Sequence, residues 1–161
     1  MSIFSRGDVK STISTPEVVR QRFRKKGLKL TPQRYAIYEM MIHTDSHPTV
    51  EDIYHAVQPR FPMLSLNTVY YTLTSLKKAG LIADVPVQEG AARFDANMDR
   101  HHHLVCLGCH KIEDLYDPTL DQLKISARKA NGYLLESHRV EFRGYCSRCR
   151  KRRSEANPKV R

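Results

Sequence analysis

Four cysteines in two widely separated pairs carry the strongest chemical signal in this sequence. Cys106 and Cys109 form one Cys-x-x-Cys motif, and Cys146 and Cys149 form a second one. A tight turn of this spacing presents two thiolates to one ion, and structural zinc takes four such ligands in a closed tetrahedron. The alternatives are two unrelated cysteine pairs or a redox-active pair. The spacing favours a four-cysteine zinc site, with one ion per subunit and no open position for catalysis.

A run of three histidines directly precedes the first cysteine pair. On a strand, His101 and His103 point to one side and His102 points to the other. His101 and His103 can therefore chelate one metal ion, with Asp95 upstream and Asp114 on the neighbouring expected strand. Imidazole and carboxylate ligands together suit Fe²⁺, Mn²⁺ or Zn²⁺, and carboxylates favour the harder ions. The alternative is a solvated strand, which is weakened because the run is internal and adjoins a cysteine pair.

The first half of the chain must supply a scaffold for Asp95. Capping residues, stop glycines and apolar periodicity predict helices over 16–27, 33–44, 49–57 and 66–79. A two-stranded hairpin is expected over 81–87 and 92–95. This order predicts a winged helix-turn-helix domain at 15–92, preceded by a flexible arm at 1–14. On the last helix, the candidate DNA-binding residues are Ser65, Asn67, Thr68, Tyr70 and Tyr71.

A smaller α/β unit is expected at 96–150, after a hinge at about 87–95, so the fold class is α+β. Strands are expected over 102–106, 111–115 and 134–142. A helix should run from the Asp117-Pro118 cap to Gly132, with Leu120, Leu123 and Ala127 on its apolar side. Such a small sheet cannot bury both faces alone, so we expect a homodimer. The charged residues 151–161 are expected to form a disordered basic tail.

The charge balance selects nucleic acid as the leading partner, with an anionic membrane surface second. The 161 residues include 27 Lys plus Arg against 17 Asp plus Glu, a formal net charge of +10. No apolar run approaches the roughly 20 residues of a membrane helix, and no secretory signal is recognisable. We therefore expect a cytoplasmic protein. A zinc enzyme is disfavoured because HExxH and Ser/His/Asp patterns are absent and the proposed ligands leave no general base.

Taken together, the motifs resemble the ferric uptake regulator (Fur) superfamily over roughly residues 15–150. The matching stretches are Leu30-Thr31-Pro32-Gln33-Arg34, His47-Pro48-Thr49-Val50-Glu51-Asp52-Ile53-Tyr54, Leu66-Asn67-Thr68-Val69-Tyr70, Arg93-Phe94-Asp95 through Cys109, and Gly144-Tyr145-Cys146. The resemblance implies a dimeric repressor that binds a palindromic operator in double-stranded DNA. A general zinc-ribbon module, the alternative binding class, would not need the histidine and aspartate ligands.

Within the superfamily, the sequence looks most like the peroxide-sensing branch. That resemblance implies one regulatory Fe²⁺ or Mn²⁺ per subunit, held by His47, Asp95, His101, His103 and Asp114. Iron-sensing relatives usually carry glutamate in place of Asp114, and Glu113 should face the other side of its strand. With Fe²⁺ bound, hydrogen peroxide would oxidise His47 or His101 and release the operator of peroxide-defence genes. The alternative is a sensor of iron, manganese or zinc without peroxide chemistry.

The resemblance also implies a possible additional metal site. His102, Asp121 and His138 match positions that bind a further metal in some relatives. Arg100 stands where those relatives often have another histidine, and the alternative is a polar cluster. In the DNA-binding helix, Tyr71 stands where many relatives have arginine, so base preferences would differ in detail.

Overall fold

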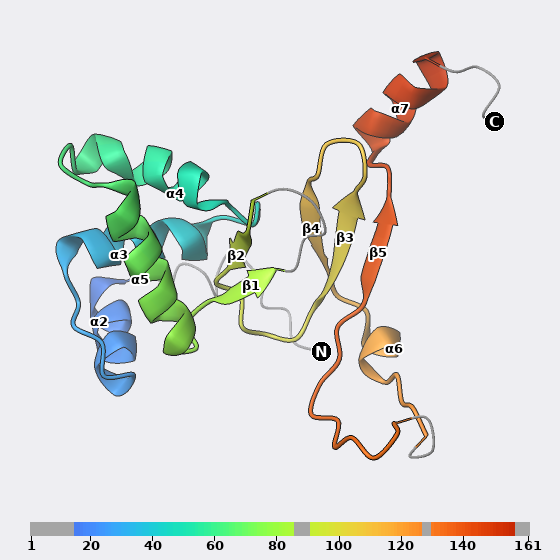
Figure 1. The fold of residues 1–161 in the computed structure, drawn as a ribbon, viewed down its shortest axis with the longest axis horizontal. Helices are drawn as coiled ribbons and strands as arrows, with labels where there is room; N and C mark the ends of the chain where they lie inside the picture. Colours follow the sequence, from blue (N-terminus) through green and yellow to red (C-terminus); the bar gives the residue numbers. More distant parts are fainter. Residues whose placement is uncertain (1–14, 86–90, 127–129, 157–161) are drawn as a thin grey trace. The chain divides into compact units, whose positions relative to one another are not determined.

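A computed structural model describes residues 15–85, 91–126 and 130–156. The chain divides into two compact units, Met1–Met98 and Asp99–Arg161, whose elements are drawn in Figure 1. The division follows closely after the predicted hinge at 87–95, of which 86–90 lie outside the described residues. The predicted arm at 1–14 also lies outside them. Within the described residues, no helix is both long and apolar enough to cross a bilayer.

Local capping explains the helices of the first unit. These helices are α2 (Pro16–Lys25), α3 (Pro32–His43), α4 (Val50–Val57), the 3₁₀ helix η1 (Gln58–Arg60) and α5 (Leu66–Lys78). Thr31, Thr49 and Ser65 each accept a hydrogen bond from the third backbone N–H that follows, as N-caps do. Gly27 and Gly80 follow α2 and α5 with φ of 67° and 66°, a left-handed conformation that favours glycine. The four predicted helices are thereby confirmed.

The core of the first unit lies between these helices. It includes Phe23 of α2, Ile37 and Tyr38 of α3, Ile53 of α4 and Leu73 of α5, all almost fully buried. The rings of Phe23 and Tyr38 meet edge to face with centroids 5.5 Å apart. Burial of these apolar side chains holds the short helices together, because none is long enough to be stable alone.

A hairpin completes the first unit as a winged helix. Strands β1 (Ala83–Val85) and β2 (Arg93–Asp95) pair antiparallel, with Ala83 opposite Asp95. The backbone N–H of Phe94 donates to the Pro48 carbonyl over 3.1 Å, and Thr49 forms an isolated bridge with Arg93. These contacts attach β2 to the segment that begins α4. The predicted hairpin is confirmed, with shorter strands.

The second unit is built on a three-stranded sheet. Its strands are β3 (His102–Cys106), β4 (Ile112–Leu115) and β5 (Glu141–Gly144), in the order β4–β3–β5. The pairing of β3 is antiparallel with β4 and parallel with β5. Helix α6 (Pro118–Asp121) follows β4, and helix α7 (Ser147–Ala156) extends beyond the end of β5 (Figure 1). The expected α+β class is confirmed.

Three expectations for the second unit are wrong. The helix predicted to reach Gly132 ends at Asp121, and Leu123 on its expected apolar side is 52% exposed and not packed in a core. Ala127 lies outside the described residues. The strand predicted over 134–142 is limited to Glu141–Gly144, where β3 supplies its pairing partner. The tail predicted to be disordered from 151 is helical to Ala156.

Candidate metal centres and DNA-binding helix

The four cysteines converge at one end of the second unit. Cys106 ends β3, Cys109 lies in the following turn, Cys146 follows β5, and Cys149 lies in the first turn of α7. Their sulfur atoms all lie within 4.8 Å of one another, and none forms a disulfide. Cys109 Sγ and Cys146 Sγ are 3.8 Å apart. Two thiolates on one tetrahedral zinc have about this separation when Zn–S is roughly 2.3 Å, so the cluster fits zinc.

The surroundings of the sulfurs also suit a cation. Burial raises the pKa of the Cys106 thiol, but backbone N–H groups of Cys146, Cys109 and Gly108 donate to its Sγ and lower that pKa to about 6. Cys106 is therefore largely thiolate at neutral pH, which is the ligand form. Burial and the three neighbouring sulfurs raise the pKa of Cys149 to about 12. A bound cation would hold all four as thiolates.

Gly108 gives the first cysteine turn the space that it needs. A Cβ added at Gly108 would lie 3.0 Å from both Cβ and Sγ of Cys149. A contact of 3.0 Å is tighter than nine in ten real Cβ contacts, so Cys149 would have to shift by a few tenths of an ångström to admit a larger residue. The filler residues of the motif are thus constrained by packing as well as by turn geometry.

In the first unit, His47 and Asp95 form a histidine–carboxylate pair. His47 lies in the loop between α3 and α4, and Asp95 ends β2. His47 Nε2 and Asp95 Oδ2 are 3.6 Å apart, and both side chains are buried. His47 adopts a φ of 49°, which is uncommon for a residue with a Cβ. Arg93 Nη1 donates to the His47 carbonyl over 3.0 Å and so connects this loop to the strand that carries Asp95.

In the second unit, His101, His103 and Asp114 form another ligand group. The Nε2 atoms of His101 and His103 are 3.0 Å apart, about the separation of two imidazoles on one ion at roughly 2.1 Å. Asp114 Oδ1 is 3.9 Å from each of these nitrogens. The β3–β4 register places Asp114 directly opposite His103, while Glu113 lies opposite Leu104 and binds Lys111. The expectation that Glu113 faces the other side of its strand from Asp114 is confirmed.

Two neighbours orient these ligands. His101 Nδ1 lies 2.7 Å from the Asp99 carbonyl, which can only accept, so Nδ1 carries the proton and Nε2 the lone pair. The Tyr116 hydroxyl donates to Asp114 Oδ2 over 3.2 Å, which leaves Oδ1 on the side of the histidines. Metal-binding histidines and carboxylates are commonly oriented in this way. The group therefore fits a metal ion that takes nitrogen and oxygen ligands.

The residues of the possible additional site lie close together. The backbone N–H of Val140 donates to His102 Nδ1 over 3.1 Å, so His102 Nε2 carries the proton and faces Asp121 Oδ1 at 3.3 Å. His138 Nε2 donates to the Leu120 carbonyl over 2.7 Å. The Arg100 guanidinium donates to His138 Nδ1 over 3.0 Å and lies 3.0 Å from Asp121 Oδ1. Arg100 thus occupies the His138 lone pair and pairs with Asp121, whereas His102 Nε2 and Asp121 Oδ1 are buried with no hydrogen-bond partner among the described residues, so an additional metal here stays a prediction.

Helix α5 presents the residues predicted to contact DNA. The side chains of Asn67, Tyr70 and Tyr71 are exposed, Tyr71 at 75%. The hydroxyls of Ser65 and Thr68 hydrogen-bond each other over 2.9 Å, and Ser65 caps the helix. Ser65 and Thr68 therefore position the start of the helix, while the other three side chains are available to a partner.

Several supporting residues were not predicted from the sequence. Arg93 holds the His47 loop, the Asp99 carbonyl sets the protonation of His101, and Tyr116 orients Asp114. A sequence signal existed only for Tyr116, which lies two residues after Asp114 and so on the same side of the chain. A backbone carbonyl and a long-range arginine contact leave no such pattern.

Comparison with known proteins identifies relatives over most of the chain. The model of the Ferric uptake regulator family matches residues 25–143. The peroxide-responsive repressor PerR of Staphylococcus epidermidis is 37% identical over 127 residues, 79% of this chain and 85% of that protein. The peroxide operon regulator of Bacillus subtilis is 35% identical over 132 residues, 82% of this chain and 91% of that protein. The ferric uptake regulator Fur of Helicobacter pylori, with three functional metal binding sites, has a TM-score of 0.71 at 25% identity, covering 88% of this chain and 93% of that chain.

Proposed function

This chain belongs to the ferric uptake regulator family, and we propose that it is a metal-dependent repressor that releases its operator when hydrogen peroxide oxidises a ligand histidine. Like these relatives, it is a transcriptional regulator and not an enzyme. The observation that carries the peroxide assignment is the pairing of Asp114 with His103 across β3 and β4, which presents an aspartate to the two histidines. We place the protein in the cytoplasm, acting on peroxide-defence genes.

The proposed regulatory site combines the ligand groups of the two units. His47 and Asp95 offer two ligands, and His101, His103 and Asp114 offer three. Neither group alone supplies the five or six ligands that Fe²⁺ and Mn²⁺ commonly take, whereas all five together leave about one position for a small molecule. A metal that needs both groups favours the arrangement of the units that satisfies it, in proportion to its differential affinity. Metal binding would in this way control DNA binding.

The chemistry of the response depends on which residues lie nearest the ion. Fe²⁺ held by these ligands would supply redox chemistry toward peroxide, with peroxide as the net two-electron oxidant of a ligand imidazole and water as its product, and Mn²⁺ would not. His47 and His101 present imidazoles as ligands, so one of them would gain an oxygen atom before the oxidant diffuses away. Oxidation of His47 would remove a ligand contributed by the DNA-binding unit and thereby uncouple metal from DNA. The four-cysteine group, closed around zinc, would keep its structural role.

DNA binding is assigned to α5 of each subunit in a homodimer. Asn67 can pair with adenine, and Tyr70 or Tyr71 can contact a thymine methyl group. Two such helices related by a two-fold axis require a palindromic operator. The net charge of +10 supplies phosphate affinity.

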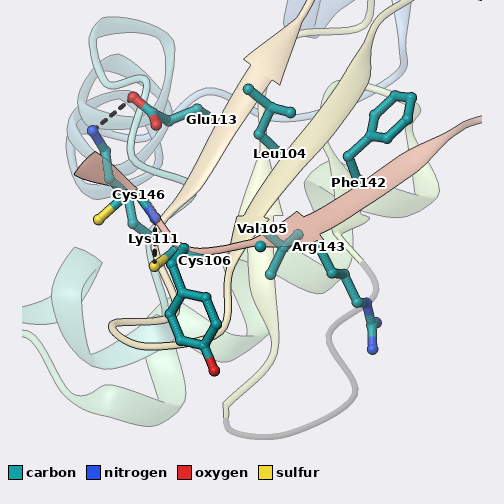
Figure 2. Close-up of a pocket in the computed structure, with 10 residues that line it drawn as sticks. Leu104, Val105, Cys106, Lys111, Glu113, Phe142, Arg143 and Cys146 are labelled. Carbon is teal, nitrogen blue, oxygen red and sulfur yellow. Dashed lines mark hydrogen bonds and ion pairs between the residues drawn. The ribbon is translucent and has the colours of Figure 1, made fainter. Parts of the chain in front are cut away.

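The second unit offers a surface for the partner subunit. One face of the sheet carries a pocket of about 210 Å³ lined by Leu104, Phe142 and residues beside the cysteines, as Figure 2 shows. Leu104 and Phe142 are 40% and 46% exposed, although they are apolar. Further exposed apolar side chains are those of Leu123, Ile125, Tyr133, Leu134 and Leu135. Exposed apolar area of this kind favours association, which supports a homodimer formed through this unit.

A test loads the protein with Fe²⁺ without oxygen, and a matched sample with Mn²⁺, before adding peroxide. We expect one added oxygen atom in a peptide containing His47 or His101, with loss of operator binding, only in the ferrous sample. Asp114→Glu keeps the charge and adds one methylene, so it should retain metal-dependent DNA binding but oxidise more slowly. Absence of histidine oxidation in the ferrous wild type would contradict peroxide sensing and leave a metal sensor.

A further inference from the structure

Helix α7 concentrates positive charge at the end of the second unit. Its sequence, SRCRKRRSEA, contains five Arg or Lys residues and one Glu in ten positions. All five cationic side chains are exposed, and Cys149 is the only buried residue of the helix. Arg153 lies over the Tyr145 ring, 4.6 Å from its centroid, and donates to the Tyr145 hydroxyl. Within the described part of the chain, no ion pair engages Arg148, Arg150, Lys151 or Arg152.

The cysteine cluster anchors this helix. The backbone N–H of Arg150 donates to the Cys146 carbonyl over 2.8 Å, so the second cysteine turn forms the first turn of α7. Cys149, one helical position before Arg150, is buried among the sulfurs. Zinc binding to the cysteines would therefore hold the start of α7 and supply the nucleus that a short helix lacks on its own.

The charge pattern of α7 is unfavourable for an isolated helix. Arg148 and Arg152 are four positions apart, and Arg150 and Arg153 are three apart, so like charges face each other along the helix surface. The helix has no apolar face to bury, because only Cys149 is covered. An anionic partner would relieve this repulsion, and it must offer several negative charges over the roughly 15 Å length of ten helical residues.

We propose that α7 is a zinc-anchored surface that binds the phosphate backbone of duplex DNA without reading its sequence. This inference rests on the proposed function, because a DNA-binding repressor brings a duplex within reach of its own cationic surfaces. Duplex DNA carries one negative charge per roughly 1.7 Å of its axis, so one α7 can face several phosphates. Four side chains, Arg148, Arg150, Lys151 and Arg152, supply the contacts, and Arg153 secures the helix to Tyr145.

The test measures the salt dependence of binding to a random-sequence duplex by the full-length, zinc-loaded protein. The variant is Arg150→Gln/Arg152→Gln, because glutamine preserves helix propensity and zinc content can be checked. Each lost phosphate contact should reduce the slope of log K against log salt by about 0.9. The double variant removes two contacts from each α7, so its slope should be smaller by about 2 for each α7 of the dimer that contacts the duplex. Between 50 and 200 mM salt, the wild type should lose at least about ten-fold more affinity than the variant.

A control variant separates local contacts from net charge. Lys124→Gln/Arg139→Gln removes the same charge from exposed positions of the same unit. It should retain the wild-type slope. The proposal would be overturned if the α7 variant and the wild type had equal slopes, or if the α7 and control variants lost slope equally. Absence of duplex binding by the wild type at low salt would overturn it as well. It would also be overturned if the α7 variant lost binding to anionic vesicles while keeping duplex binding.

Failure of the proposed function gives a different result. Without peroxide sensing, the ferrous protein would show no histidine oxidation, while the slope difference on random duplex would persist. Conversely, a protein that oxidises normally but has the same slope in wild type and α7 variant would retain the proposed function and lose the role of α7.

Discussion

Replacing Arg93 with methionine should weaken Mn²⁺ binding at the proposed regulatory site by about ten-fold without disturbing zinc binding at the four-cysteine cluster. Arg93 Nη1 donates to the His47 carbonyl over 3.0 Å, and His47 has a φ of 49°. A hydrogen bond from a charged donor contributes about 1.5–3 kcal/mol, and a left-handed residue costs about 1–2 kcal/mol. Because Arg93 is half-buried, we take the lower end, and about 1.4 kcal/mol corresponds to ten-fold in affinity.

The assay is competition for Mn²⁺ against a fluorescent chelator, with zinc content and thermal unfolding measured on the same samples. Arg60→Met is the matched control, because it removes an arginine of the same unit that pairs with Glu39 over 2.7 Å and does not contact the His47 loop. Unchanged Mn²⁺ affinity in Arg93→Met would refute the idea that this bond holds His47 in its ligand conformation. An equal loss of Mn²⁺ affinity in Arg93→Met and Arg60→Met would show that the removed positive charge, and not the hydrogen bond to His47, causes the effect.

Three further perturbations test other parts of the structure. Gly108→Ala should speed zinc loss to a chelator, because its Cβ would lie 3.0 Å from Cys149 and overpacking costs about 1–3 kcal/mol. The control variant is Gly144→Ala, whose Cβ would meet nothing within 4 Å, and it should lose zinc as slowly as the wild type. A hydrogen bond from the Thr49 backbone N–H lowers the pKa of Asp52. The wild type should therefore have a larger free energy of unfolding than Asp52→Asn, with the full difference above about pH 5 and a loss of that difference as pH falls through the lowered pKa. A difference in unfolding free energy that stays constant with pH would contradict this. Chelation by EDTA should distinguish two bound metals, one resistant because four thiolates enclose it and one labile because nitrogen and oxygen ligands hold it; loss of both metals under mild EDTA would contradict this division.

Much of the fold and the four-cysteine cluster could be predicted from the sequence, because their signals are local. The Thr49 cap with Asp52 three residues later marks the start of α4 wherever the helix packs. Gly27 and Gly80 end helices through their own backbone conformation. The spacing of Cys106 and Cys109 likewise defines a two-thiolate turn, and strand alternation separates His102 from its two neighbours.

Only the tertiary structure decided features that depend on contacts between distant residues. His47 takes a left-handed conformation that the Arg93 side chain, 46 residues away, supports. Arg100 donates to His138, 38 residues away, and forms an ion pair with Asp121. The helix after Asp117 ends at Asp121 with Leu123 half exposed, whereas α7 forms because the second cysteine turn begins it. In each case the local conformation is stabilised by contacts with residues that are distant in the sequence, and sequence spacing does not reveal those contacts.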